Sequence, residues 1–170
     1  DNLAHLRDIA REIAQSAGMP FADVYQPMIA AMQQAKPALG EKYHVCGGDG
    51  FHPAANGHLV MAYAFLKDLR LDGQIGTITV EMNGSPWKVI TSDDHKVLSV
   101  ADGAIELEST RYPFCFFGDE SSPDGTRSIL PYVPFNAELN RLTLVVRGLR
   151  GTGATVTWGE TKKHFARQQL

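Results

Sequence analysis

An aspartate and a histidine three residues apart are the pair in this chain best suited to acid–base chemistry. Asp49 and His52 lie in the string GGDGFHPAANGH, where Gly47, Gly48 and Gly50 allow tight turns and Pro53 can open a helix. Such a loop can turn the carboxylate of Asp49 back onto Nδ1 of His52. The ring is then held in one tautomer, and Nε2 is free to take a proton from a hydroxyl nucleophile. The pair therefore predicts a general base and its orienting partner.

The elements that must position this loop begin with a helix. Residues 2–17 carry apolar side chains at spacings of three and four, with charged residues on the other face, and Gly18 follows. This pattern predicts an amphipathic helix that ends at Gly18. Residues 19–25 form a short apolar run with a proline near its start, which is typical of a buried strand in a parallel sheet.

Two further helices are expected around the glycine loop. Pro27 can stand at the first position of a second helix, which Lys36 and Pro37 are expected to stop. A third helix is expected from Pro53 to about residues 71–73, with an apolar inward face. Residues 1–72 therefore read as the C-terminal part of an α/β domain.

After residue 75 the hydrophobic period changes to two, which indicates strands. Apolar and polar residues alternate up to Asn83-Gly84, a pair that favours a hairpin turn. Further strands are expected at residues 87–91, 96–100, 104–108, 112–117, 142–146 and 154–158. Residues 118–126 are polar and are expected to form an exposed loop between strands. The pattern predicts a β-rich, sandwich-like accessory domain over residues 75–160, and residues 161–170 are expected to be a tail or the start of a helix.

Charge and hydropathy exclude several classes of partner. The net charge is −3, with both signs scattered along the 170 residues, so no basic surface for nucleic acid is expected. The longest apolar runs are shorter than the roughly 20 residues needed to cross a bilayer, so no membrane span is expected either. Cys46 and Cys115 could form one disulfide, and the sequence leaves their pairing open.

The loop also contains residues that could bind a metal ion or act as a nucleophile. Five potential metal ligands lie within fifteen residues, namely His44, Cys46, Asp49, His52 and His58. Their spacing fits no strong zinc pattern, and no metal is expected. Cys46 as a nucleophile would need a lowered thiol pKa and an oxyanion site, neither of which the sequence shows. His58 is expected to pack or cap within the third helix.

The string DGFHPAANGH, followed by an apolar helix, resembles the last conserved block of the SGNH, or GDSL-type, hydrolases. The resemblance covers residues 1–72 and implies a flavodoxin-like α/β fold that carries a serine esterase. It implies that His52 is the catalytic base and Asp49 its partner, and that no cofactor is required. A small-molecule or carbohydrate ester, in particular an acetyl ester, is the implied substrate. The β-rich part is similar to the accessory segment of some bacterial members, and the family favours a secreted or periplasmic location.

The chain departs from the family pattern in its nucleophile. The family serine stands in a Gly-Asp-Ser sequence that comes earlier in the chain, and this sequence contains no Gly-Asp-Ser. The most similar segment has Glu120 between Asp119 and Ser121, and it lies in the polar loop after the histidine. Asn56 and Gly57 are assigned to the helix start and are not assumed to form an oxyanion hole. The serine is therefore expected in a missing N-terminal part of the same hydrolase domain, and this chain alone is expected to be inactive.

A non-catalytic function is the alternative. In this hypothesis the β-rich part binds a glycan or a protein, and the helical part is its scaffold. Trp87 and Trp158 could stack on sugars, but the alternation of the aromatic residues is also what a sandwich core requires. A Gly-Asp-Ser sequence after an apolar strand upstream of Asp1 would favour the enzyme, and its absence would favour the binding module.

Overall fold

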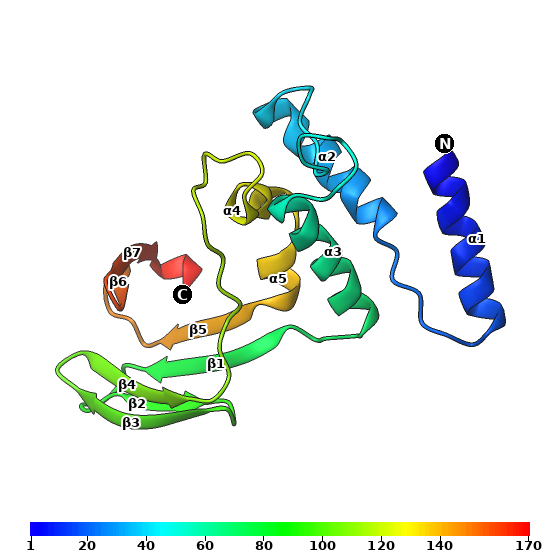
Figure 1. Ribbon diagram of the computed structural model, residues 1–170. Helices are drawn as coiled ribbons and strands as arrows, with labels where there is room; N and C mark the ends of the chain where they lie inside the picture. The colour runs from blue at the N-terminus through cyan, green and yellow to red at the C-terminus, as the bar shows by residue number, and fades with distance from the viewer. The chain divides into compact units, whose positions relative to one another are not determined.

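The computed structural model describes all 170 residues, and their contacts divide the chain into two compact units. Residues 1–73 and 114–140 form the first, which we call the helical unit, and residues 74–113 and 141–170 form the second, the strand unit. The chain is thus a mixed α/β protein, with helices and three small sheets (Figure 1). No helix has both the length and the apolar content that a bilayer crossing requires.

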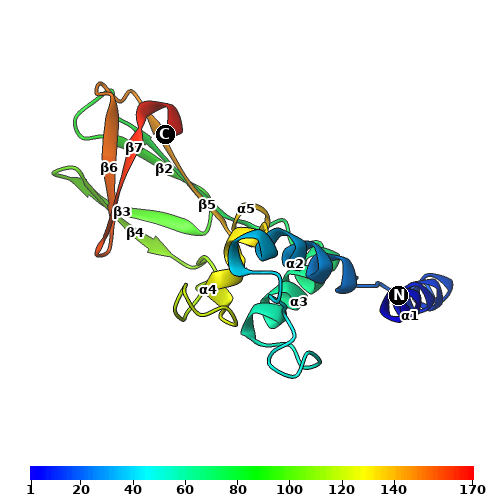
Figure 2. The same cartoon turned by 90° about the horizontal axis from the view of Figure 1, so that it is seen from above.

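The helical unit contains the five α-helices and one of the two 3₁₀ helices. They are α1 (Asn2–Ser16), α2 (Tyr25–Leu39), α3 (Ala55–Asp68), α4 (Thr126–Ile129), η1 (Leu130–Tyr132) and α5 (Phe135–Leu139). Figures 1 and 2 show α2 and α3 side by side, with α4 and α5 against α3. Their shared core contains Ala31, Val60, Ile129, Phe135 and Leu139, all nearly or fully buried. The return of residues 114–140 to the helices is therefore fixed by burial of Ile129, Phe135 and Leu139.

The prediction of a strand at residues 19–25 is wrong. Residues 19–24 form no strand, and α2 already begins at Tyr25, two residues before Pro27. Asp23 starts this helix, because its Oδ1 accepts hydrogen bonds from the backbone N–H groups of Tyr25 (3.0 Å) and Gln26 (3.1 Å). The apolar run has no neighbouring strand in the helical unit with which to form backbone hydrogen bonds, so it forms an irregular connection between α1 and α2. Residues 112–117, also predicted as a strand, likewise pair with no other strand.

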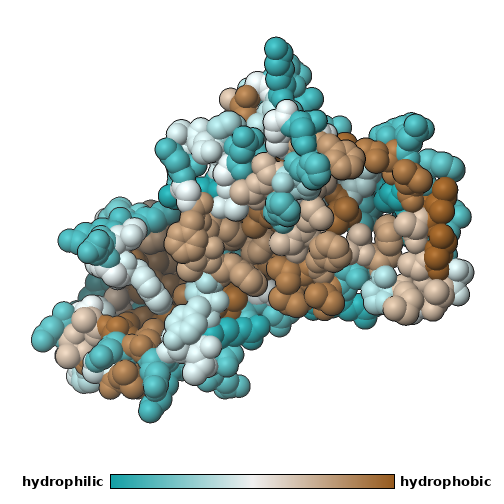
Figure 3. All heavy atoms as spheres, viewed as in Figure 1, coloured by the Kyte–Doolittle hydropathy of each residue, from teal (hydrophilic) through white to brown (hydrophobic).

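Helix α1 is present as predicted, but its apolar stripe is exposed. Leu3, Leu6 and Ile13 keep 65%, 60% and 62% of their surface open to solvent. The charged face packs inward instead: Arg7 forms an ion pair with Asp23 (3.2 Å) and lies over the Tyr25 ring. Figure 3 shows apolar side chains at the surface over α1. The amphipathic pattern thus located the helix correctly, but its apolar face has no partner in this chain.

The second and third helices differ from prediction only at their ends. Helix α2 continues two residues past Pro37 and ends where Gly40 takes a φ of 99°. Pro37 lies in the last turn, and Pro27 in the first turn, where the amide that proline lacks would have no intrahelical partner. Helix α3 begins at Ala55, two residues after Pro53.

The strand unit contains seven strands in three sheets. They are β1 (Gln74–Glu81), β2 (Lys88–Thr91), β3 (His95–Ala101), β4 (Ala104–Ser109), β5 (Arg141–Arg147), β6 (Gly153–Trp158) and β7 (Thr161–Ala166), and the 3₁₀ helix η2 (Arg167–Gln169) follows. β1 pairs with β2 antiparallel and with β5 parallel, while β3–β4 and β6–β7 are two-stranded antiparallel sheets. The β-rich character predicted from residue 75 onwards holds for residues 74–113 and 141–170, but residues 114–140, which the prediction placed in the same accessory domain, carry α4, η1 and α5 and belong to the helical unit. The sandwich arrangement of the sheets stays a prediction. β7 was missed because its residues, TKKHFA, carry almost no apolar alternation.

A buried histidine joins two of these sheets, and no motif in the sequence marks it. His95, on β3, is 5% exposed; its Nε2 donates to the carbonyl of Ile75 on β1 (3.0 Å). In the neutral ring Nδ1 is then an acceptor, and it lies 2.8 Å from the hydroxyl of Ser109 on β4. Gly76 leaves the space for this ring, because a Cβ there would stand 2.0 Å from Nε2.

We expect Gly76→Ala to destabilise the strand unit by about 1–3 kcal/mol, because the added methyl overpacks the site of the His95 ring. Chemical denaturation followed by tryptophan fluorescence measures this loss, since both tryptophans belong to the strand unit. Gly84→Ala is the matched control, since its Cβ would meet nothing closer than 3.6 Å. Equal stability of the two variants would contradict the packing described here.

Candidate functional site

Asp49 and His52 are in direct contact, as their spacing predicts. Nδ1 of His52 lies 2.6 Å from Oδ2 of Asp49. The other carboxylate oxygen, Oδ1, accepts hydrogen bonds from the backbone N–H groups of Phe51 and His52, each at 2.9 Å. One side chain therefore closes the turn and orients the imidazole ring.

The carboxylate charge fixes the tautomer of this pair. The hydrogen bond from the His52 ring and the two backbone N–H groups lower the pKa of Asp49 to about 2. Asp49 is thus ionised at neutral pH and can only accept, so Nδ1 of His52 must carry the proton that is donated. Nε2 is then the basic nitrogen of the neutral ring, and it accepts no hydrogen bond from the protein.

The pair lies on the surface of the helical unit. The side chain of His52 is 78% exposed and that of Asp49 is 53% exposed. Phe51, between them, is 78% exposed, and its ring meets the His52 ring edge-on at 5.0 Å. The arrangement can take a proton from a hydroxyl group that approaches Nε2 from outside the unit.

The base of the loop is closed by backbone contacts. The N–H of Ala54 donates to the carbonyl of the buried Val45 (3.3 Å), so residues 46–53 form a loop with adjoining ends. Gly57, in the first turn of α3, allows this approach, since a Cβ there would lie 2.2 Å from the Val45 carbonyl oxygen. The Asp–His pair is therefore carried at the outer part of a loop whose two ends are fixed to α3.

Asn56 holds this closed loop to the rest of the helical unit. It is fully buried, and its Nδ2 lies within hydrogen-bond distance of the Tyr43 hydroxyl (3.0 Å) and the carbonyls of His44 (3.3 Å) and Pro123 (3.2 Å). Its backbone N–H donates to the carbonyl of Asp124 (3.0 Å). From the sequence, Asn56 was expected only to belong to a helix start. An asparagine at an otherwise apolar beginning of a helix, directly followed by glycine, is the signal that could have marked it.

The other candidate residues do not contact Asp49 or His52. Nδ1 of His58 bonds the Ala54 carbonyl (3.0 Å), which is the local role within α3 expected for it. Cys46 and Cys115 are not joined in a disulfide. No three histidine, cysteine, aspartate or glutamate side chains converge in a way that could hold a metal ion. In the Gly118–Ser121 segment Asp119 accepts from the backbone N–H of Ser121 (2.8 Å), and no strand-to-helix turn is present there.

The comparisons with known proteins concern the fold. No protein-family model and no curated protein matches the sequence. A solved structure that matches is that of a gut microbial diltiazem-metabolizing enzyme, with a TM-score of 0.68 over 90% of this chain and 23% sequence identity. The chain spans 36% of the length of that enzyme. The likeness shows that the arrangement of helices and small sheets seen here also occurs within a larger enzyme.

We expect Asn56→Ala to destabilise the helical unit by about 1–3 kcal/mol, because it leaves the buried hydroxyl of Tyr43 and the part-buried carbonyl of His44 without their donor. Thermal unfolding followed by circular dichroism at 222 nm measures the effect. Gln34→Ala, which removes an exposed amide from α2, is the control and should change stability little. A null result for Asn56→Ala would show that the amide does not hold the loop.

We expect the carboxyl of Asp49 to titrate with a midpoint near 2, and His52→Ala to raise that midpoint, because the ring hydrogen bond is the largest cause of the lowered pKa. Because folding lowers this pKa, the ionised carboxylate stabilises the folded loop at pH values above about 3.9, the pKa of an aspartate in the unfolded chain. This stabilisation is lost as the pH falls through about 2. Carbon NMR of the carboxyl groups measures the midpoint. Asp119 serves as control in the same spectrum, since Ser121 lowers its pKa and the substitution should leave it unchanged. An unshifted Asp49 midpoint in His52→Ala would contradict the contact.

Proposed function

We propose that this chain supplies the histidine and the aspartate of a Ser-His-Asp triad in an SGNH-type serine ester hydrolase. The observation that supports it is the 2.6 Å contact between Nδ1 of His52 and Oδ2 of Asp49, with Nε2 directed to no group of the chain. A buried asparagine and a closed loop hold the pair before helix α3. The flavodoxin-like setting of this loop, with residues 1–72 as the last part of the α/β domain, belongs to the same proposal.

In the proposed reaction, Nε2 of His52 takes the proton of a serine hydroxyl as the serine oxygen attacks the ester carbonyl. The tetrahedral intermediate breaks its bond to the alcohol, which leaves with the proton from His52. Water then gives a proton to Nε2 and attacks the acyl-serine, and the acid is released as the proton returns to the serine. Asp49 remains ionised throughout and stabilises the imidazolium form of His52.

The exposed stripe of α1 supports the part of the proposal that places the serine outside this chain. Leu3, Leu6 and Ile13 form a contiguous apolar face, and soluble proteins seldom leave such a face uncovered. We infer that a further part of the hydrolase domain, which carries the serine, packs there. Within ester hydrolysis, acetyl esters of carbohydrates are the substrate class that the sequence resemblance suggests. The matching diltiazem-metabolizing enzyme adds diltiazem as a test compound.

The non-catalytic alternative has one observation in its favour. The strand unit has a hollow of about 400 Å³, lined by Ser85, Pro86, Trp87, Val100, Ala101, Asp102 and Gly103. An indole ring beside a carboxylate is a combination that can stack on a sugar and bind its hydroxyl groups. Quenching of tryptophan fluorescence by oligosaccharides, lost in Trp87→Ala, would support this glycan-binding function.

We expect His52→Ala to lower the hydrolysis of p-nitrophenyl acetate by the full-length protein about 10³-fold or more, because no other group takes the serine proton. His58→Ala is the matched control: it removes a second exposed histidine six residues away and should leave the rate unchanged. The release of p-nitrophenol, followed by its absorbance, measures both. If His52→Ala retains the wild-type rate, the proposed function is wrong.

A further inference from the structure

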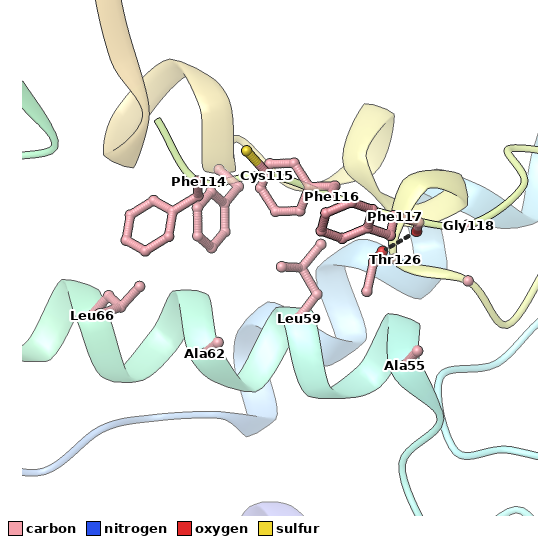
Figure 4. A pocket seen from close by; sticks show the side chains of 12 residues that line it. Ala55, Leu59, Ala62, Leu66, Phe114, Cys115, Phe116, Phe117, Gly118 and Thr126 are labelled. Atoms are coloured by element: carbon pink, nitrogen blue, oxygen red, sulfur yellow. Dashed lines mark hydrogen bonds between the residues drawn. The ribbon is translucent and has the colours of Figure 1, made fainter. Parts of the chain in front are cut away.

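An open apolar groove runs along α3 in the helical unit. One wall is the α3 face formed by Ala55, Leu59, Ala62 and Leu66, and the other is the extended segment 114–118 (Figure 4). Gly125, Thr126 and Phe135 complete a hollow of about 610 Å³. This volume lies within the range of about 300–1,000 Å³ that is usual for small-molecule sites.

Local packing explains why the groove is open. Phe114 and Phe116 both place their rings edge-on against the buried Phe135, at centroid distances of 5.4 and 5.3 Å. This fixes the segment beside α3 without pairing it as a strand. Phe117 is left 81% exposed, and the two alanines of α3 present only methyl groups to the space. The groove is therefore built on the packing of Phe114 and Phe116 against Phe135.

The lining favours an apolar ligand. It consists of aromatic, aliphatic and glycine residues together with the thiol of Cys115 and the hydroxyl of Thr126. The Thr126 hydroxyl already donates to the carbonyl of Phe117 (2.8 Å). No charged side chain faces the groove, so sugar hydroxyl groups would lose their hydrogen bonds with water on entering it.

The groove ends close to the Asp–His pair. Ala55 is the first residue of α3 and lies three residues after His52, so their Cα atoms are at most about 11 Å apart. Phe117 and Thr126 stand opposite this same end of α3 (Figure 4). The adjacent residue, Asn56, ties the loop that carries His52 to the helix.

We propose that this groove binds the apolar part of an ester, aromatic or long-chain alkyl, and directs the ester carbonyl towards His52. The proposal rests on the function proposed above for the role of His52, and it deepens that function by naming the substrate class. It favours an aryl or alkyl ester over a sugar acetate as the compound bound by this site.

The test is direct binding of 1-naphthyl acetate to the 170-residue chain, followed by methyl NMR. We expect saturable shifts of the Leu59 and Leu66 methyl groups, and no comparable shifts with an acetylated xylose. Ala62→Trp fills the groove and should weaken binding tenfold or more, and Phe117→Ala about fivefold through loss of a ring contact. Phe65→Ala is the control, because Phe65 is exposed on α3 outside the groove.

Non-saturable shifts, or equal binding by wild type, Ala62→Trp and Phe117→Ala, would overturn the groove proposal. Since Phe117 is exposed, its variant keeps the test decisive even if Ala62→Trp fails to fold. Failure of the proposed function is seen separately. Hydrolysis that survives His52→Ala contradicts the catalytic role alone, whereas absent binding with an essential His52 contradicts the groove alone.

Discussion

The site depends on a buried amide. Asn56 has no solvent exposure, and its side chain meets oxygens from two segments that are far apart in the sequence, residues 43–44 and Pro123. A buried amide without partners would be costly, so these segments must come together if α3 is to begin where it does. The loop that carries His52 starts and ends at this point. The position of the Asp–His pair is therefore set by core hydrogen bonding and not by the exposed loop itself.

The Asp–His contact combines a structural and a chemical role in one carboxylate. Oδ1 of Asp49 satisfies two backbone N–H groups of the turn, and Oδ2 orients the ring of His52. Because the same three donors lower the pKa of Asp49, the turn and the ionised state support each other. The pair is open to solvent, so its basic nitrogen is available to a group that approaches from outside the unit.

The sequence was sufficient for features that depend on local pattern. Helix α1, helix α3, most strands and the Asp49–His52 contact follow from periodicity, turn residues and a spacing of three. It failed where distant partners decide. Residues 19–25 and 112–117 have the composition of strands, but a strand requires a neighbour, and none pairs with them here. Phe114 and Phe116 find the ring of Phe135 instead, and the role of Asn56 depends on Pro123, 67 residues away. Pattern alone cannot supply such partners.

The tautomer of His52 decides whether Nε2 can act as a base. Nitrogen-15 NMR of the histidine rings in the 170-residue chain, at a pH where His52 is neutral, distinguishes a protonated Nδ1 from a protonated Nε2. We predict that His52 carries its proton on Nδ1, bonded to Asp49, with Nε2 unprotonated, and that Asp49→Asn abolishes this preference. A His52 ring protonated mainly on Nε2 would contradict it, because such a ring could not accept the proton of a hydroxyl nucleophile.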